Sequence, residues 1–245
     1  MLNLFHVHTY RCNHAENISD ELYIKRALQL HANSITFTDH APFPGNCFGN
    51  RMQYEQLPEY ISTLQELKMR YQGQIDVKIG LEIEYLPSFQ SYYEELAACQ
   101  HLDILMVGQH FYEEKPGQYS FLLKNKNEVE HRGCMTAIHQ AIETGFFSVI
   151  AHPDRSFRRV TGWNEECTTL SRAVIESAAA KGIVLERNLS SLEQKNYFRT
   201  EFWNLLLPNN KTVTGLDAHA LSELERDENK LKNIGRKMYA SRVRC

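Results

Sequence analysis

Residues 3–9, NLFHVHT, contain the pattern on which the whole fold depends. A short apolar run typical of a buried strand leads directly into two histidines, His6 and His8. Residues two apart on an extended strand point to the same face, so both imidazoles should face the same way. The loop that follows adds a third histidine, His14. A strand that ends in potential metal ligands is therefore the unit to look for elsewhere in the chain.

Six further stretches begin with a short apolar run: SITFTDH (34–40), IDVKIGLEIEY (75–85), DILMVGQHF (103–111), FSVIAHP (147–153), GIVLER (182–187) and KTVTGLDAH (211–219). Stretches of helical period lie between several of them, at 19–32, 55–71, 127–145 and 170–182. Strands that alternate with helices predict a parallel sheet with right-handed crossovers. We predict an α/β fold, a closed or nearly closed β/α barrel, that forms a single domain over residues 1–245.

Composition and charge exclude several classes of function. The 245 residues are 42% hydrophobic and 23% charged, with a net charge of -3, so no strong field draws nucleic acid or an anionic membrane. No apolar run approaches the roughly 20 residues that cross a bilayer, and the N-terminus lacks the features of a secretory signal. The six cysteines are scattered and form no CxxC pair. We expect a cytoplasmic protein with reduced thiols and no nucleic-acid or membrane partner; the sequence leaves the oligomeric state open.

Two connections are long and rich in aromatic residues, at 41–58 and 112–127. Loops of this length in a compact domain are usually functional or disordered. The aromatic content favours ordered loops near a ligand, and surface decoration is the alternative.

Ligand-type residues stand at or just beyond the ends of six of the seven predicted strands. In a β/α barrel the active site lies at this one face, so residues from different strands can meet in one pocket. Imidazole and carboxylate together suit Zn, Mn or Fe. One tetrahedral ion cannot use so many ligands, and the set is large enough for two or three ions with one carboxylate bridging. The candidate ligands are His6, His8, His14, His40, Glu82, His110, His152, Asp217 and His219.

Other charged residues near the strand ends have two interpretations each. Glu84 is either a solvated charge or an acceptor behind a ligand. Asp39 either orients the neighbouring imidazole of His40 or caps the following turn. The remaining histidines have no partner pattern and are interpreted as structural: His31, His101, His131 and His139.

Two arginines near strand ends are candidate substrate-binding residues. Arg155 stands three residues after His152, and Arg187 ends the stretch at 182–187. A guanidinium can bind two phosphate oxygens at once. The alternative for Arg155 is an ion pair with Asp154 or with another acid of the loop.

The motifs in chain order resemble those of the PHP (polymerase and histidinol phosphatase) superfamily, and within it the histidinol-phosphatase branch. They are HVHTYRCNHAE (6–16), FTDHAPFP (37–44), GLEIEY (80–85), GQHF (108–111), AHPDR (151–155) and GLDAH (215–219). The resemblance implies a distorted (β/α)7 barrel with a metal cluster at the C-terminal ends of the strands. It also implies three divalent ions, commonly Zn, Fe or Mn, and hydrolysis of phosphoesters.

The same resemblance implies a distribution of the ligands. His6 and His8 bind the first ion with Glu82 and Asp217. Glu82 bridges to a second ion, which His110 and His152 complete. The third ion is bound by His14, His40 and His219.

The function that the resemblance implies is hydrolysis of L-histidinol phosphate to L-histidinol and phosphate, a step of histidine biosynthesis. A metal-activated hydroxide would attack phosphorus, with Glu82, Asp217 and His219 as catalytic residues. The chain departs from the branch at Leu189, Ser190 and Ser191, and at Gly215–Leu216, near the expected pocket wall. Three alternatives stay open: a phosphoesterase for another small metabolite or nucleotide, a nuclease or proofreading module, and a non-catalytic metal-binding module.

Overall fold

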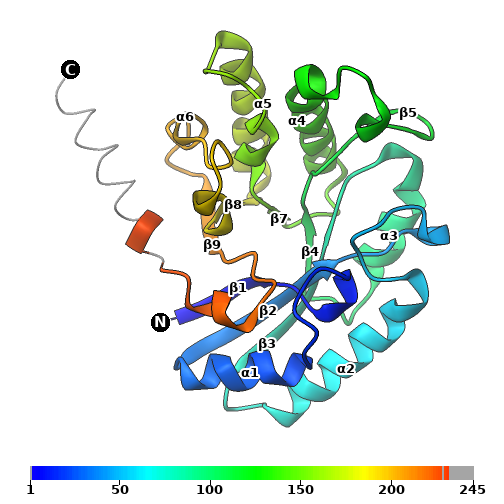
Figure 1. Cartoon of the computed structure of the whole chain (residues 1–245), viewed down its shortest axis with the longest axis vertical. Coiled ribbons are helices and arrows are strands. Elements are labelled where there is room, and N and C mark those ends of the chain that lie inside the picture. Colours follow the sequence, from blue (N-terminus) through cyan, green and yellow to red (C-terminus); the bar gives the residue numbers. More distant parts are fainter. Residues whose placement is uncertain (1, 228, 232–245) are drawn as a thin grey trace.

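Seven parallel strands form the centre of the molecule, as the computed structural model shows (Figure 1). The structure describes residues 2–227 and 229–231, and the statements below concern these residues. Each strand pairs with the next one of the sheet along the chain, in the order β1-β2-β3-β4-β7-β8-β9. Their bounds are Leu2–Val7, Ala32–His40, Asp76–Ile83, Ile104–Val107, Val149–Ile150, Val184–Asn188 and Lys211–Gly215. All seven predicted strands are therefore present.

The sheet closes into a barrel through backbone hydrogen bonds between β1 and the segment after β9. The N–H of Leu216 donates to the Phe5 carbonyl at 2.8 Å, and the N–H of Ala218 donates to the His6 carbonyl at 3.0 Å. The N–H of His8 returns a bond to the Ala218 carbonyl at 2.8 Å. The first and last strands thus meet, which confirms the predicted barrel.

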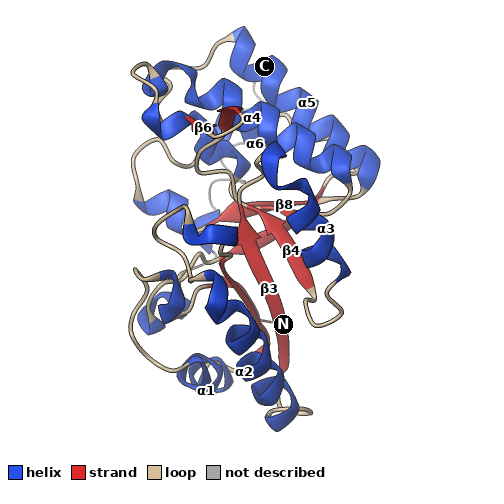
Figure 2. Ribbon diagram, turned by 90° about the vertical axis from the view of Figure 1, so that its right-hand side faces the viewer, coloured by secondary structure: helices blue, strands red, loops and turns tan. Residues whose placement is uncertain are grey.

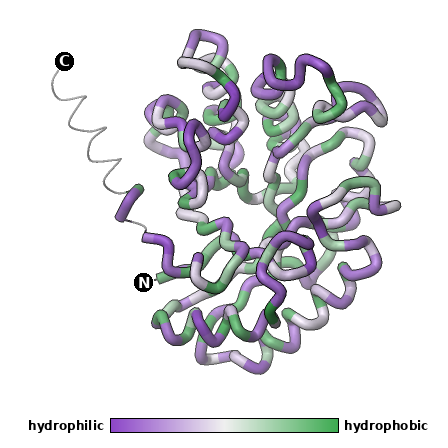
Figure 3. The backbone as a smooth tube through the Cα atoms, viewed as in Figure 1, coloured by the Kyte–Doolittle hydropathy of each residue, from purple (hydrophilic) through white to green (hydrophobic). Residues whose placement is uncertain are grey.

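Helices surround the strands (Figures 1 and 2). They are α1 (Asp20–Gln29), α2 (Leu57–Arg70), α3 (Gln90–Ala98), α4 (Lys126–Thr144), α5 (Glu165–Lys181) and α6 (Thr200–Trp203). Hydrophobic and hydrophilic segments alternate along their length (Figure 3), as expected of helices with one face on a core. Helices α4 and α5 end at Gly145 (φ 76) and Gly182 (φ 69), where a left-handed residue is needed. Among the described residues, no helix is long and apolar enough to span a membrane.

The four predicted helices are present as α1, α2, α4 and α5, whereas α3, α6 and several short elements were not predicted. A small antiparallel hairpin, β5 (Glu113–Lys115) with β6 (Gln118–Tyr119), lies within the second long connection. Single turns of 3-10 helix complete the structure: η1 (Tyr10–Cys12), η2 (Pro44–Asn46), η3 (Tyr54–Gln56), η4 (Pro87–Phe89), η5 (Ser120–Leu122), η6 (Pro153–Phe157), η7 (Ser190–Glu193) and η8 (Leu221–Glu225).

The two long connections pack against each other through aromatic rings. The ring of Phe48 lies 5.0 Å from Phe111, 4.8 Å from Tyr119 and 6.4 Å from Phe121, measured between centroids. Aromatic pairs at these distances attract each other beyond their apolar burial. The predicted order of these loops is thus explained by mutual packing.

A small apolar cluster fills the barrel interior below the strand ends. Phe5, Met106, Val149 and Ala151 contact one another, although β1 and β4 are not neighbours in the sheet. Side chains from such strands can meet only across the interior. His6 follows Phe5 and His152 follows Ala151, so the polar site begins directly above this apolar layer.

Candidate metal centre

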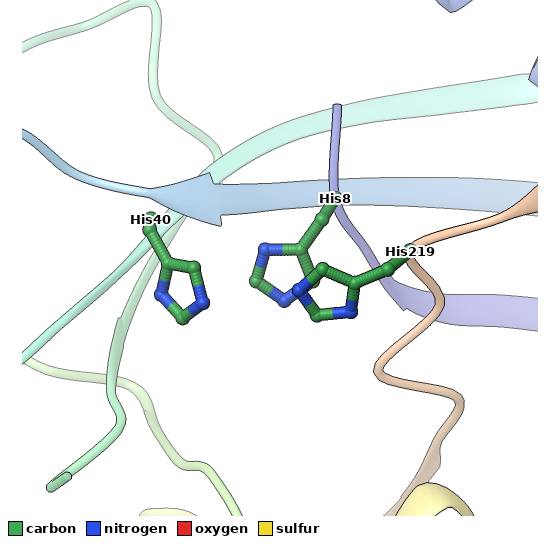
Figure 4. Close-up of side chains that lie close together, drawn as sticks. All are labelled: His8, His40 and His219. Atoms are coloured by element: carbon green, nitrogen blue, oxygen red, sulfur yellow. The ribbon is translucent and has the colours of Figure 1, made fainter. Parts of the chain in front are cut away.

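The structure brings all nine candidate ligands to one end of the barrel. His6 lies in β1 with His8 just after it, His40 ends β2, and Glu82 lies in β3. The others follow η1, β4, β7 and β9: His14, His110, His152, Asp217 and His219. Figure 4 shows the rings of His8, His40 and His219 close together, although His8 follows β1, His40 ends β2 and His219 follows β9.

Glu82 lies at the centre of this group and is 1% exposed. Its Oε2 is 3.1 Å from His40 Nδ1, and its Oε1 is 2.9 Å from His152 Nε2. The other three imidazoles are 3.4 to 3.8 Å from one of its oxygens: His6, His8 and His110. One carboxylate with imidazoles around both oxygens has the geometry of a bridging ligand.

Among the described residues, five groups of three potential ligands have their ligand atoms within 4.8 Å of one another, and three of the groups consist of candidate ligands alone: His6, His8 and Asp217; Glu82, His110 and His152; and His8, His40 and His219. The first two agree with the expected grouping, with Glu82 near both. The third contains His8 where His14 was expected. His14 forms a separate set with Cys12 and His219, and its ring centroid lies 5.2 Å from that of His40. His14 is therefore at the edge of the cluster.

Seven buried atoms of the cluster have no hydrogen-bond partner among the described residues. They are His6 Nε2, both ring nitrogens of His8, both carboxylate oxygens of Glu82, His152 Nε2 and His219 Nε2. A buried polar atom without a partner costs about 1–3 kcal/mol, so such a concentration requires an occupant. Imidazole nitrogens and carboxylate oxygens are ligands of Zn, Mn and Fe. The residues present fit divalent ions.

A bulge in β1 lets two consecutive residues face the interior. The pairing register between β1 and β2 shifts between Phe5 and Val7, and His6 in between has φ 70. A bulge of this kind interrupts the side-chain alternation of a strand. Phe5 therefore packs in the interior cluster while His6 joins the metal centre directly after it.

Two other candidate ligands also have positive φ, His152 at 28 and Asp217 at 51. Left-handed backbone at a residue other than glycine is strained by about 1–3 kcal/mol and accumulates at functional sites. Three of the eight non-glycine residues with positive φ in the described part of the chain are candidate ligands, His6, His152 and Asp217.

Three buried carboxylates lie behind the imidazoles. Glu186 Oε1 is 2.5 Å from His6 Nδ1, and Glu84 Oε1 is 2.9 Å from His110 Nδ1. Asp39 Oδ1 lies 3.5 Å from His8 Nδ1. A carboxylate on Nδ1 fixes the ring and leaves the Nε2 lone pair for an ion.

These contacts show that Glu84 supports a candidate ligand from behind, and that Asp39 lies behind the ring of His8 and not behind that of His40. Glu84 is 1% exposed, so it is an acceptor behind a ligand and not a solvated charge. Asp39 faces the ring of His8, while it contacts His40 only by accepting its backbone N–H at 2.8 Å. Sequence reasoning did not single out Glu186 as a site residue, although its position next to the end of β8 was a usable signal.

Among the candidate ligands, two histidines have raised pKa values and three have lowered ones. Burial alone would lower the pKa of His8, but the carboxylates of Asp217 and Asp39 beside its ring raise it to about 9. The pKa of His6 is likewise raised despite its burial, by Glu186 and Glu82. These two rings hold protons that an arriving ion must displace.

Three other imidazoles, those of His40, His152 and His219, have lowered pKa values and are therefore neutral at neutral pH. Burial lowers the pKa of His152 to about 4, and the nearby Arg155 guanidinium contributes. Burial, with the charge of His8, lowers the pKa of His219 to about 3. Burial opposes ionisation of Glu82, but the surrounding histidines lower its pKa well below the usual value. The centre thus offers lone pairs and negative charge together.

Arg155 lies in a pocket of about 490 Å³ that opens beside the cluster, with His40, His110 and His219 also in its wall. Its Nη2 donates to Asp217 Oδ2 at 2.8 Å and to Asn188 Oδ1 at 3.1 Å. Ser190 and Ser191 also accept from Nη2, each at 3.0 Å. The alternative ion pair with Asp154 is not formed, because that carboxylate accepts from the Arg199 N–H and the Trp203 indole.

The expectation that Arg187 binds substrate needs correction. Neighbouring residues of a strand point to opposite faces, and Glu186 of β8 faces the cluster. The Arg187 guanidinium instead lies 5.4 Å from the ring centre of Trp203, away from the pocket.

Two arginines that sequence reasoning did not select line the pocket instead. Arg51, from the first long connection, donates to both oxygens of Glu84 at 3.0 and 3.2 Å. Arg226 donates to the carbonyls of Leu216 and Asp217 at 2.8 and 3.0 Å. The aromatic character of the loop was a signal for Arg51, and the sequence offers none for Arg226.

The remaining histidines lie outside the centre, as expected. None of the close ligand sets in the described part of the chain contains His31, His101, His131 or His139.

Proteins similar to this chain are named histidinol phosphatases. Over 192 residues the chain is 27% identical to "Probable histidinol-phosphatase" of Deinococcus radiodurans, which covers 75% of this chain and 71% of that protein. HisK of Listeria monocytogenes has a similar structure, with a TM-score of 0.78 at 17% identity over 93% of this chain and 99% of that one. Histidinol phosphate phosphatase of Lactococcus lactis, solved with Zn, L-histidinol and phosphate, gives 0.73 at 19% identity over 97% and 93%.

The two structures support the fold, and the family follows from the sequence match. The sequence profile of the PHP domain matches residues 5–190, a stretch that holds seven of the nine candidate ligands. Asp217 and His219 lie beyond it and complete the same cluster. The chain belongs to the PHP domain family.

Proposed function

We propose that this chain is a divalent-metal-dependent phosphomonoester hydrolase whose substrate is L-histidinol phosphate. The observation that carries the proposal is Glu82, buried among imidazoles directly beside a pocket with several arginines in its wall. The names of the Deinococcus radiodurans and Lactococcus lactis proteins support the substrate. The reaction converts the phosphoester and water to L-histidinol and inorganic phosphate, within histidine biosynthesis.

The residues present would hold up to three ions, of Zn, Fe or Mn. His6, His8 and Asp217 form the first set with one oxygen of Glu82, and the other oxygen joins His110 and His152. The third set contains His40 and His219, with His8 and His14 on either side. When bound, such ions lower the pKa of a coordinated water and neutralise charge on phosphoryl oxygens.

The side chains of the pocket orient the phosphate. Arg155 and Arg51 lie on different sides of the strand ends, one in η6 and one in the first long connection. Guanidinium groups in a partly buried pocket bind phosphoryl oxygens strongly and hold them in a fixed direction. Asp217 and His219 face the same pocket and, with Glu82, are the residues that we propose to be catalytic.

Another small phosphorylated metabolite or nucleotide is the second candidate substrate. The specific observation in its favour is the pair Ser190 and Ser191, which departs from the histidinol-phosphatase pattern and contacts Arg155. A change at the residues that hold a phosphate-binding arginine could alter which ester fits the pocket.

A chelator experiment and a substrate panel test the proposal. Dialysis against a strong chelator should abolish phosphate release, and Mn, Zn or Fe should restore it. The panel contains histidinol phosphate, mononucleotides and a phosphodiester. A clear preference for histidinol phosphate supports the first candidate, and a preference for a mononucleotide supports the second. Full turnover by metal-free protein would contradict both.

We also propose that the chain forms one domain over residues 1–245 and acts in the cytoplasm. All seven strands of the barrel belong to one sheet, which supports a single domain. The cysteines in the described residues are free thiols, as is usual in a reducing compartment.

A further inference from the structure

Arg11 is a buried cation outside the metal centre, and only 2% of it is exposed. Its Nε and Nη2 donate to the two carboxylate oxygens of Glu59, at 2.8 and 2.9 Å. Its Nη1 donates to both oxygens of Asp20, at 3.0 and 2.9 Å. The guanidinium carbon lies 4.6 Å from the ring centre of Tyr10. Arg11 therefore has a fixed position between the first turns of α1 and α2.

One further contact leads from Arg11 towards the metal centre. Its Nη1 also donates to Thr9 Oγ1 at 3.2 Å. The Thr9 hydroxyl donates to Asp39 Oδ2, and Asp39 Oδ1 lies 3.5 Å from His8 Nδ1. Thr9, Asp39 and His8 are all fully buried, so water does not compete for these contacts.

The direction of these hydrogen bonds follows from the donors available. Thr9 has one O–H donor, and its oxygen receives N–H groups from the Arg11 side chain and backbone, at 3.2 and 3.4 Å. The hydroxyl proton is therefore free to bind Asp39. With one carboxylate oxygen held in this way, the other faces His8 Nδ1, and His8 Nε2 faces Asp217 Oδ1 at 3.3 Å.

We propose that Arg11 is a positioning residue for the metal centre, which acts through Thr9 and Asp39 to hold the Nε2 lone pair of His8 towards the ion shared with His6 and Asp217. The inference rests on the proposed function for the presence of that ion. It adds a residue that contacts neither ion nor substrate. Outer partners of metal-ligating histidines typically change metal affinity by 10–100-fold.

A purely structural role for Arg11 makes a different prediction. If Arg11 only joined α1 to α2, its bonds to Asp20 and Glu59 would be the important ones. Loss of the Thr9 hydroxyl would then leave metal affinity unchanged. The two roles can be separated because the bonds to Thr9 and to Glu59 use different nitrogens of the guanidinium.

The test is a Co²⁺ titration of metal-stripped protein, followed by visible absorption, which needs no substrate. Thr9→Val removes the hydroxyl at constant shape, and Thr9→Ser restores it. Arg11→Met removes the cation, and the double variant Thr9→Val/Arg11→Met tests whether the two act together. Glu59→Gln is the matched control, because it weakens an Arg11 ion pair outside the path to His8. Urea unfolding of each metal-free variant measures stability separately.

We expect Thr9→Val to weaken one Co²⁺ site by about 10–100-fold, the range for such outer partners, while Thr9→Ser and Glu59→Gln bind as the wild type does. Arg11→Met should weaken the same site, and the double variant should be no weaker than either single variant. Wild-type affinity in Thr9→Val, or additive losses in the double variant, would overturn the proposal. If Arg11→Met does not fold, the Thr9→Val and Thr9→Ser pair decides. A wild-type protein that binds no Co²⁺ contradicts the proposed function instead.

Discussion

Glu82 is the central side chain of this site, because five imidazoles lie within 3.8 Å of its carboxylate oxygens. It is 1% exposed with imidazoles around both oxygens, so its two oxygens can belong to two different ions. Glu84, two residues later, is equally buried but bonds Arg51 and His110 Nδ1 instead of facing the centre. Two glutamates of one strand end thus have separable roles.

We predict that Glu82→Gln lowers the metal content by more than one ion and abolishes turnover. The amide keeps the shape but removes the negative charge and one acceptor, which both ion sites need. Glu84→Gln should retain more metal and more activity, since it changes only the groups that support His110 and Arg51. Metal analysis by mass spectrometry with a phosphate-release assay measures both. Equal metal content in the two variants would show that Glu82 is not a bridge.

Arg155 and Arg187 form a natural pair for a second prediction. Arg155→Ala removes a charge-assisted contact with phosphate of about 1.5–3 kcal/mol, so kcat/KM should fall roughly ten- to a hundred-fold or more. Inorganic phosphate should also inhibit this variant less well. Arg187→Ala is the control and should keep the wild-type inhibition constant, because Arg187 packs on Trp203 outside the pocket. The reverse result would restore Arg187 as the phosphate ligand.

The sequence could not predict which charged side chains are buried in the fold. The candidate ligands could be predicted because histidines and carboxylates, the residue types that bind metals, stand at the ends of strands. Arg11 and Arg226 resemble ordinary surface arginines in the sequence, and only their partners in the fold identify them. The position of His14 at the edge of the cluster depends on the turn at η1, where Asn13 has φ 65.

At the scale of the elements, strand ends create the room that the site needs. An ideal Cβ at Gly108, just after β4, would lie 2.0 Å from Glu82 Oε1. One at Gly215, the last residue of β9, would lie 1.6 Å from Glu186 Oε1. Neither backbone requires glycine for its φ, so the absence of a side chain is what these positions supply.

We predict that Gly108→Ala folds but loses metal, because its methyl group and Glu82 cannot share the same space. Gly80→Ala in β3 is the matched control: its Cβ would approach the Ile104 carbonyl at 2.8 Å, away from the cluster. Both variants should lose stability in urea unfolding, and only the first should lose bound Co²⁺. Full metal binding by Gly108→Ala would show that Glu82 moves without consequence.

The seven strands of the barrel could be predicted because each begins with a short, separate apolar run, and most of these runs end in candidate ligands. The missed helix α3 buries Tyr92, Tyr93 and Leu96, so aromatic residues replace the aliphatic stripe that identifies a helix. The prediction for Arg187 considered that the residue stands at a strand end, but not which face of the strand its side chain lies on. The alternation of Glu186 and Asn188 in β8 contains that information.

At the scale of the whole molecule, the metal-free protein should depend on pH in an unusual direction. Burial lowers the pKa of His8, but the neighbouring carboxylates of Asp217 and Asp39 outweigh burial and raise it to about 9. A raised folded-state pKa stabilises the protein below the unfolded value of about 6.5, and this contribution is lost as pH rises to 9. The raised pKa of His6 acts in the same sense.

We therefore predict that the metal-free protein is less stable at pH 9 than at pH 6.5, by about 1–3 kcal/mol. Bound ions replace these protons, so the loaded protein should not share this loss. Urea unfolding with and without chelator at the two pH values measures the difference. A metal-free protein that gains stability over this range would show that His6 and His8 are not protonated in it.

The closure of the barrel has a consequence for how the protein comes into being. β1 forms backbone bonds with residues 216–218, and the ligand sets combine His6 and His8 with Asp217 and His219. A ribosome synthesises His6 and His8 long before Asp217 and His219. Until then the nascent chain exposes an open sheet edge and an incomplete set of ligands. A complete set of ligands is therefore available only after residue 219 has been synthesised, so an ion that arrives earlier meets a partial site.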